Sequence, residues 1–291
     1  MKLKEFLAIS VGVFVAYNGM SQVLDPGAES PLDGIYSKSV DTPHKKPIPY
    51  VQLREADIMW LQRVWREVDM REKANNSFYF PLDPTQGRKN LMQIIKEAIE
   101  LERLHAYSAK DSTTLFPDDT FKRQVTYAEV MKSMTTTNTV AGDADEYGDV
   151  EYYEQLDSIK WNTITRFRLK EEVFFDKQRS VMETRILGIA PMKPEKNSEG
   201  EIEGYSEAFW IYFPEARFVF AEAEVYNTHN DADRMTYEEL FWKRKFNSRI
   251  VKVSNVYDRA IGDYKVPLDA LLEAEKIEEE IFNREHDIWS F

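Results

Sequence analysis

One acidic stretch of the chain spaces its carboxylates as a calcium loop does. Within residues 143–154, acids fall at loop positions 1, 3 and 12, and these are Asp143, Asp145 and Glu154. Oxygen ligands at these positions hold Ca²⁺ in an EF-hand loop. Position 5, however, is Tyr147 where Asp or Asn is usual, and the preceding residues make a poor entering helix. We therefore expect a solvated acidic loop, and calcium binding is the alternative.

The rest of the sequence contains no recognisable catalytic motif. The chain has no cysteine and only four scattered histidines, which argues against a zinc site and against thiolate chemistry. It has no phosphate-binding glycine loop, no nucleophile elbow and no zinc-protease motif. Alternating polar residues at 227–233 could converge on a cation, but they serve equally as turn formers and caps. We expect no catalytic residue, no cofactor and no metal, although abundant carboxylates leave a hydrolase pair open.

The segment 240–264 is basic and aromatic, whereas the chain as a whole is acidic. The chain has 51 Asp and Glu against 38 Lys and Arg, which gives a formal net charge of −13. Arginine and tryptophan are residue types that often dominate the energy of an interface. A contact surface for something anionic is therefore expected here, and its residues would be Trp242, Lys243, Arg244 and Arg249. The alternative is that these cations pair internally with the acidic excess.

The first 21 residues have the features of a secretory signal peptide. Two lysines precede an apolar run at 6–17, and small residues follow at Gly19 and Ser21. Cleavage before Gln22 fits this pattern. An uncleaved anchor is the alternative, but the run is shorter than the ~20 residues that a membrane span needs. Export and the net charge of −13 argue against nucleic acid as a partner.

The N-terminal half is expected to be helical. A helix is predicted over 54–73, where Ile58, Leu61, Val64, Trp65 and Val68 recur at helical spacing. A second helix is predicted over 90–103. Thr126 and Glu129 fit a capping box before a short third helix.

The C-terminal half is expected to mix strands and helices. Residues 180–190 and 207–213 are predicted to be the strands of a long antiparallel hairpin, with a turn at 196–200. A further strand is predicted at 249–256, and a last helix from Pro267 to about residue 283.

Together these elements predict an α+β fold, with a helical N-terminal half and an antiparallel β-hairpin plus helices in the C-terminal half. Residues 22–51 carry five prolines and are expected to extend from the body and to order against a neighbouring chain. The predicted parts are a signal peptide at 1–21, an extended Pro-rich arm at 22–51, a helical part at 52–134, a polar acidic loop at 135–156 and a mixed part at 157–291. The helical and mixed parts could form one continuous domain.

Several blocks, taken in order along nearly the whole mature chain, resemble the GldN/PorN family, a gliding-motility and type IX secretion component of Bacteroidota. The blocks are 31–34 (PLDG), 57–66, 174–180, 185–191, 240–258 and 285–289. Residues 135–154 match the family least.

The resemblance implies a periplasmic, non-enzymatic structural subunit that lies at the inner face of the outer membrane. Members of the family associate directly with an outer-membrane lipoprotein, GldK/PorK, and further copies of both proteins form a ring. The inner-membrane components GldL and GldM (PorL and PorM) are functionally linked to that ring. On this basis Trp242, Lys243, Arg244 and Arg249 would contact the lipoprotein or the next copy. The alternative is a periplasmic hydrolase or ligand-binding protein with an acidic cleft.

Overall fold

The computed structural model describes most of the chain from residue 45 onward. The described residues are 45–84, 87–110, 117–144, 150–158, 161–196, 201–227, 230, 232 and 234–289. They belong to one compact unit that spans residues 42–291. The predicted signal peptide and residues 22–44 of the predicted arm lie outside the described residues.

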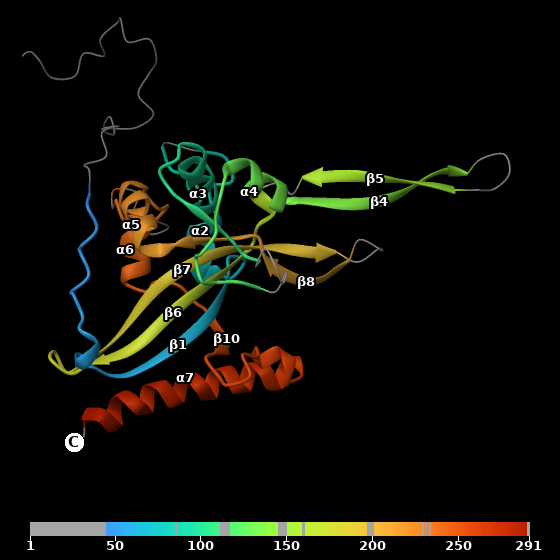
Figure 1. The fold of residues 1–291 in the computed structure, drawn as a ribbon. Helices are drawn as coiled ribbons and strands as arrows, with labels where there is room; N and C mark the ends of the chain where they lie inside the picture. The colour runs from blue at the N-terminus through green and yellow to red at the C-terminus, as the bar shows by residue number, and fades with distance from the viewer. Residues whose placement is uncertain are drawn as a thin grey trace, which may run out of the picture. The chain divides into compact units, whose positions relative to one another are not determined.

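An antiparallel sheet, eight-stranded in the described part of the chain, forms the frame of this unit (Figure 1). Its order is β10-β1-β6-β7-β9-β2-β3, and β8 pairs with the far end of β7. The strands are β1 (Ile58–Asp69), β2 (Ala106–Ser108), β3 (Gln124–Val125), β6 (Arg166–Asp176), β7 (Val181–Lys196), β8 (Ile202–Glu207), β9 (Phe209–Tyr212) and β10 (Arg249–Val253). A separate two-stranded sheet contains β4 (Thr135–Ala144) and β5 (Val150–Ser158).

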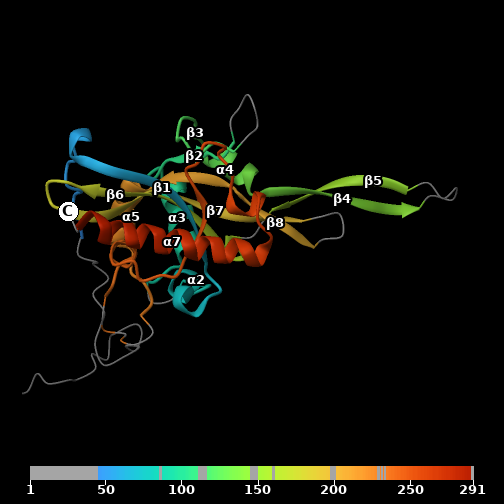
Figure 2. The same ribbon diagram turned by 90° about the horizontal axis from the view of Figure 1, so that it is seen from below.

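A few helices accompany the sheet (Figures 1 and 2). They are α2 (Asn76–Tyr79), α3 (Leu91–Glu100), α4 (Tyr127–Ser133), α5 (Phe213–Glu222), α6 (Tyr237–Trp242) and α7 (Pro267–Trp289), with short 3₁₀ turns η1 (Glu55–Asp57), η2 (Lys73–Asn75), η3 (Trp161–Thr163) and η4 (Ile261–Asp263). None of the helices in the described part of the chain is both long and apolar enough to cross a bilayer.

Two apolar clusters hold helices on the sheet. The larger cluster joins α3, α5 and α6 to the central strands, and Phe167, Leu169 and Phe220 are fully buried in it. The smaller cluster lies under α7, where Ala274 packs with Val64 and other residues of β1, β6 and β10. Helix α7 therefore packs on the sheet through a different cluster from α5 and α6, and its surface is separate from theirs.

The predicted fold class is wrong, because the N-terminal half is not helical and the protein is built on a mostly antiparallel sheet with a few helices. The largest error is the helix predicted over 54–73, which is strand β1. This strand pairs with β6 along nearly its whole length and with β10 over its second half. Valine, isoleucine and tryptophan favour a pleated, half-buried surface, and cross-strand partners decide the outcome. Arg63 faces Glu172, and Arg166 donates to Glu67 at 2.9 Å, so even the charged positions are paired across strands.

Elements specified by local signals lie where they were predicted. The second predicted helix is α3, which opens with a capping box between Asn90 and Gln93. The Thr126–Glu129 capping box opens α4. The predicted strands 180–190 and 207–213 correspond to β7, which runs on to Lys196, and to β9, but the long hairpin partner of β7 is β8, which was not predicted. Helix α7 begins at Pro267 as predicted and runs on to Trp289.

The segment predicted to be a polar loop, 135–156, contains strands. Thr135 of β4 pairs with Ser158 of β5, and the pairing continues to Ala144 and Val150 with one irregularity. Strand β4 is rich in threonine, β5 contains two tyrosines and each has a valine, and these residue types favour the extended conformation.

Candidate interaction site

Residues 45–51, here termed the strap, run without regular secondary structure beside α5, α6 and the first half of β7 (Figure 1). Lys45 Nζ lies 3.1 Å from Glu239 Oε1 of α6. The carbonyl oxygen of Ile48 accepts a hydrogen bond from Arg217 Nη2 of α5 at 2.7 Å. The carbonyl oxygen of Val51 accepts one from Arg185 Nη2 at 3.0 Å. The described end of the predicted arm therefore contacts its own chain.

An aromatic and cationic stack fixes the centre of the strap. The ring of Tyr50 stacks on Trp242, with centroids 6.0 Å apart and planes inclined by 24°. The guanidinium groups of Arg217 and Arg185 lie 4.1 and 4.8 Å from the centroid of the Tyr50 ring. Such cation–π contacts are each worth ~0.5–2 kcal/mol, depending on desolvation. Burial raises the pKa of the Tyr50 hydroxyl, so the ring stays neutral between the two cations.

Beneath the strap lies a buried ion pair. Arg217 of α5 is only 4% exposed, and its Nη2 lies 2.6 Å from Glu238 Oε1. Glu238 stands in the first turn of α6, where the positive end of the helix dipole favours a carboxylate. A buried guanidinium is costly unless its donors are satisfied. The carbonyl oxygen of Ile48 supplies one acceptor, so the strap completes the environment of this pair.

A cavity of about 450 Å³ lies between the strap and the body. Apolar side chains from β7, α5 and α6 line one part of it, and these are Met182, Ile186, Phe213 and Phe241. Arg179, Glu183 and Thr184 line another part. The walls are mixed in character, and the strap itself forms one wall, so the cavity depends on the strap staying in place.

Two of the four predicted contact residues lie beside the strap. Trp242, at the last position of α6, is half exposed and stacks on Tyr50. Lys243 follows it and lies 3.4 Å from Glu239, the residue that also binds Lys45. Trp242, Lys243 and the strap therefore form one continuous surface.

The other two predicted contact residues pair with buried carboxylates of the sheet. Arg244 makes a bidentate contact with Glu171, both bonds at 3.0 Å, and Arg66 Nε lies 3.3 Å from the same fully buried carboxylate. Arg249 donates to Glu67 at 2.9 Å. For these two arginines the structure shows the internal pairing that was the alternative interpretation.

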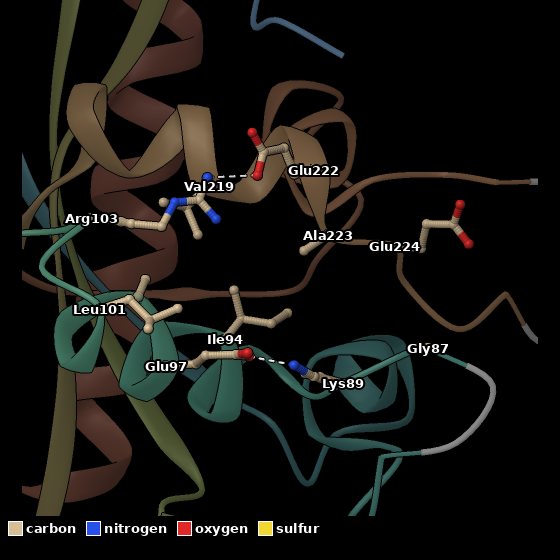
Figure 3. A pocket seen from close by; sticks show the side chains of 11 residues that line it. Gly87, Lys89, Ile94, Glu97, Leu101, Arg103, Val219, Glu222, Ala223 and Glu224 are labelled. Atoms are coloured by element: carbon tan, nitrogen blue, oxygen red, sulfur yellow. Dashed lines mark hydrogen bonds and ion pairs between the residues drawn. The ribbon is translucent and has the colours of Figure 1, made fainter. Parts of the chain in front are cut away.

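A second cavity, of about 260 Å³, lies between α3 and α5 (Figure 3). Its carboxylates all face cations: Glu97 pairs with Lys89, Glu222 with Arg103, and Glu224 with Arg234. A general acid or base needs a carboxylate free to exchange a proton with a substrate. Acids that are each paired with a cation, in a cavity of mixed polar and apolar lining, do not form such a site.

The candidate calcium residues lie on a hairpin. Asp143 is on β4, Glu154 is on β5 opposite Thr139, and Asp145 lies outside the described residues. Over the described ranges, no group of three or more His, Asp or Glu side chains is arranged to hold a metal ion.

Sequence comparison places these features in a family. A family model described as gliding motility associated protein GldN matches residues 53–290, which is most of the chain. No curated protein matches the chain.

Proposed function

The chain belongs to the GldN family of gliding motility associated proteins, and from this premise we propose that it is a structural subunit of the type IX protein secretion and gliding motility machinery. In this proposal the subunit is exported, loses residues 1–21, and lies in the periplasm at the inner face of the outer membrane. There it assembles with an outer-membrane lipoprotein of the GldK/PorK type into a ring, which is functionally linked to the inner-membrane GldL and GldM components.

The observation that carries the proposal is the extent of the family match. Residues 53–290 include every strand from β1 to β10 and all the helices named above, so the match covers the sheet and its helices, and the strap precedes it. The chain is therefore related to the family across its architecture and not through one shared motif.

The described carboxylates support a non-enzymatic role. Those of the cavity between α3 and α5 are each paired with a cation. Those at the centre of the sheet, Glu67 and Glu171, are bound by arginines. The hydrolase alternative needs a carboxylate pair that is accessible to a substrate, and no such pair is present among the described residues of these two regions.

The test is purification of the affinity-tagged protein from native envelopes, followed by mass spectrometry and electron microscopy. We expect the outer-membrane lipoprotein to co-purify in a fixed ratio, in particles much larger than a single chain. The intact mass should correspond to a chain that begins at Gln22. A protein recovered as a monomer without the lipoprotein, or one that retains residues 1–21, would contradict the proposal.

A further inference from the structure

Helix α7 carries apolar side chains on two opposite faces. The inner face packs on the sheet through Ala270, Ala274, Ile277 and Ile281. The other face leaves large apolar side chains in solvent, and their exposed fractions are 70% for Leu268, 45% for Leu271, 58% for Leu272 and 68% for Phe282. A helix on the surface of a monomer normally has one apolar face and one polar face. The second apolar face of α7 therefore indicates a contact surface.

The exposed face has the spacing of a helix–helix contact. Leu268, Leu272, Glu275, Glu279 and Phe282 follow one another at alternating intervals of four and three residues, and they are here termed the outer stripe. This alternation keeps side chains in line along one side of a helix. The two glutamates of the outer stripe therefore lie between the leucines at one end and Phe282 at the other.

Glu275 and Glu279 are, with Asp269 and Glu285, acids of α7 without an ion-pair partner among the described residues, whereas other acids of the helix are paired. Glu273 pairs with Lys265, Glu278 with Arg66, and Glu280 with Lys276. Among the described residues, neither Glu275 nor Glu279 has an ion-pair partner. Glu275 and Glu279 lie in line with the exposed apolar side chains of the outer stripe, so the stripe fits a partner surface that is both basic and apolar.

The strap and the end of α6 provide a surface of that chemistry. Lys45 and Lys243 lie on either side of Glu239, at 3.1 and 3.4 Å. Beside them, Lys46 is exposed, and Ile48 and Trp242 are 64% and 48% exposed. These five residues, Lys45, Lys46, Ile48, Trp242 and Lys243, are here termed the strap face. It carries three lysines and two exposed apolar side chains, and the neighbouring acid is Glu239, which contacts Lys45 and Lys243.

We propose that the outer stripe of one copy docks on the strap face of a second copy. Glu275 and Glu279 would face Lys46 and its neighbouring lysines, and the apolar ends of the stripe would cover Ile48 and Trp242. In both ribbon views the first half of α7 lies away from the strap, so one chain does not cover its own stripe in this way (Figures 1 and 2). A contact between two different surfaces is heterologous, and its repetition gives a closed ring or a filament. The inference rests on the proposed function in that several copies gather in one complex.

Crosslinking in native envelopes tests the contact directly, because the natural chain has no cysteine. Lys46→Cys and Leu272→Cys place one thiol on each surface, and a bifunctional thiol reagent joins thiols that lie close together. We expect the double variant to give a ladder of covalent dimers, trimers and larger species. Each single variant should stay monomeric, because a heterologous contact brings residue 46 close to residue 272 and not to its own equivalent. A pair of Glu203→Cys on β8 and Leu272→Cys is the control and should give no ladder.

Charge exchange tests the same contact without a crosslinker. The variant E275K/E279K should weaken self-association roughly tenfold, and K46E should weaken it less, because it reverses one charge and not two. Combining the three substitutions should recover part of the loss seen in E275K/E279K, because the glutamate introduced at position 46 would face the new lysines. Glu203→Lys, an exposed acid of β8, is the charge-matched control and should leave association unchanged. Circular dichroism should be the same for all variants, because none of these side chains is paired with another described residue.

The outcomes are distinct. Crosslinking of either single variant with itself, or a monomeric double variant in a complex that keeps its size and its lipoprotein, would refute the docking and leave the proposed function standing. Separate loss of association in E275K/E279K and K46E with no recovery on combination would also refute it. Failure of the unmodified protein to purify in any complex would refute the proposed function, and the docking with it.

Discussion

Arginine–glutamate pairs connect elements in two regions of the molecule, the centre of the sheet and the region beneath the strap, and they do so in different ways. In the sheet, Glu171 is fully buried and binds Arg66 and Arg244, and Arg66 in turn reaches Glu278 of α7. Arg66 and Glu278 belong to β1 and α7, and Arg244 lies two residues after the end of α6. Under the strap, Arg217 is equally buried, but one of its acceptors is the carbonyl oxygen of Ile48, in a segment with no secondary structure.

The comparison shows that the same residue types can build a permanent frame or a removable contact. Displacing any partner of Glu171 requires part of the sheet, α6 or α7 to move. Displacing the strap requires only the loss of side-chain contacts and a few hydrogen bonds, because residues 45–51 are not hydrogen-bonded into the sheet as a strand. We therefore expect changes in the sheet to affect global stability and changes at the strap to act locally.

The largest expected effect comes from Glu171→Gln. Removing this charge leaves Arg66 and Arg244 without their shared carboxylate, and breaking a buried ion pair costs about 3–5 kcal/mol. The free energy of unfolding, measured with urea, should fall by that amount with little change in the slope. Glu172→Gln is the matched control, because the pair of Glu172 with Arg63 is partly exposed, and it should cost less than about 1 kcal/mol. Equal losses of unfolding free energy in the two variants would show that the buried pairs of Glu171 stabilise the protein no more than a partly exposed ion pair does.

Arg217→Met sharpens the comparison at the strap. The variant keeps most of the side-chain volume but leaves Glu238 without its cation, and it removes the donor to Ile48. We expect a loss of about 2–4 kcal/mol, together with rapid tryptic cleavage after Lys45 while the rest of the chain stays resistant. Arg103→Met, at the exposed pair with Glu222, is the control and should cause neither this loss of stability nor the tryptic cleavage. Cleavage spread across the sheet would mean that the strap is part of the frame.

Prediction from sequence succeeded where the determining contacts are local. Helix α3 could be predicted because Asn90 and Gln93, three residues apart, cap its first turn. Strand β1 could not, because its apolar residues also fit a helical period and the choice was made by β6, about a hundred residues away. The charged residues Arg63 and Glu67 have their partners, Glu172 and Arg166, on the neighbouring strand.

The candidate site follows the same rule. The basic and aromatic composition of one short segment predicted a surface at Trp242 and Lys243. It did not separate them from Arg244, whose partner Glu171 is distant in sequence. Tyr50 and Arg217 were missed, since the contact between Arg217 and the strap joins residues 169 positions apart and neither belongs to a local motif.

Acidification should give the smallest effect, and it should act at the strap through Glu239. Burial raises the pKa of Glu239, but the hydrogen bond from Lys45 and the charges of Lys45 and Lys243 outweigh it and hold that pKa below its usual range. A carboxyl whose folded-state pKa is lowered contributes stability that is complete above its unfolded pKa, near 4.5, and is lost as the pH falls through the folded value. Hydrogen exchange of the strap amides should therefore speed up below about pH 4.5, after correction for the intrinsic rate. In Glu239→Gln the same amides should exchange faster at neutral pH and show little further change on acidification. A wild-type strap that stays as protected at pH 3.5 as at pH 7 would show that its aromatic stack, and not the Lys45–Glu239 contact, holds it in place.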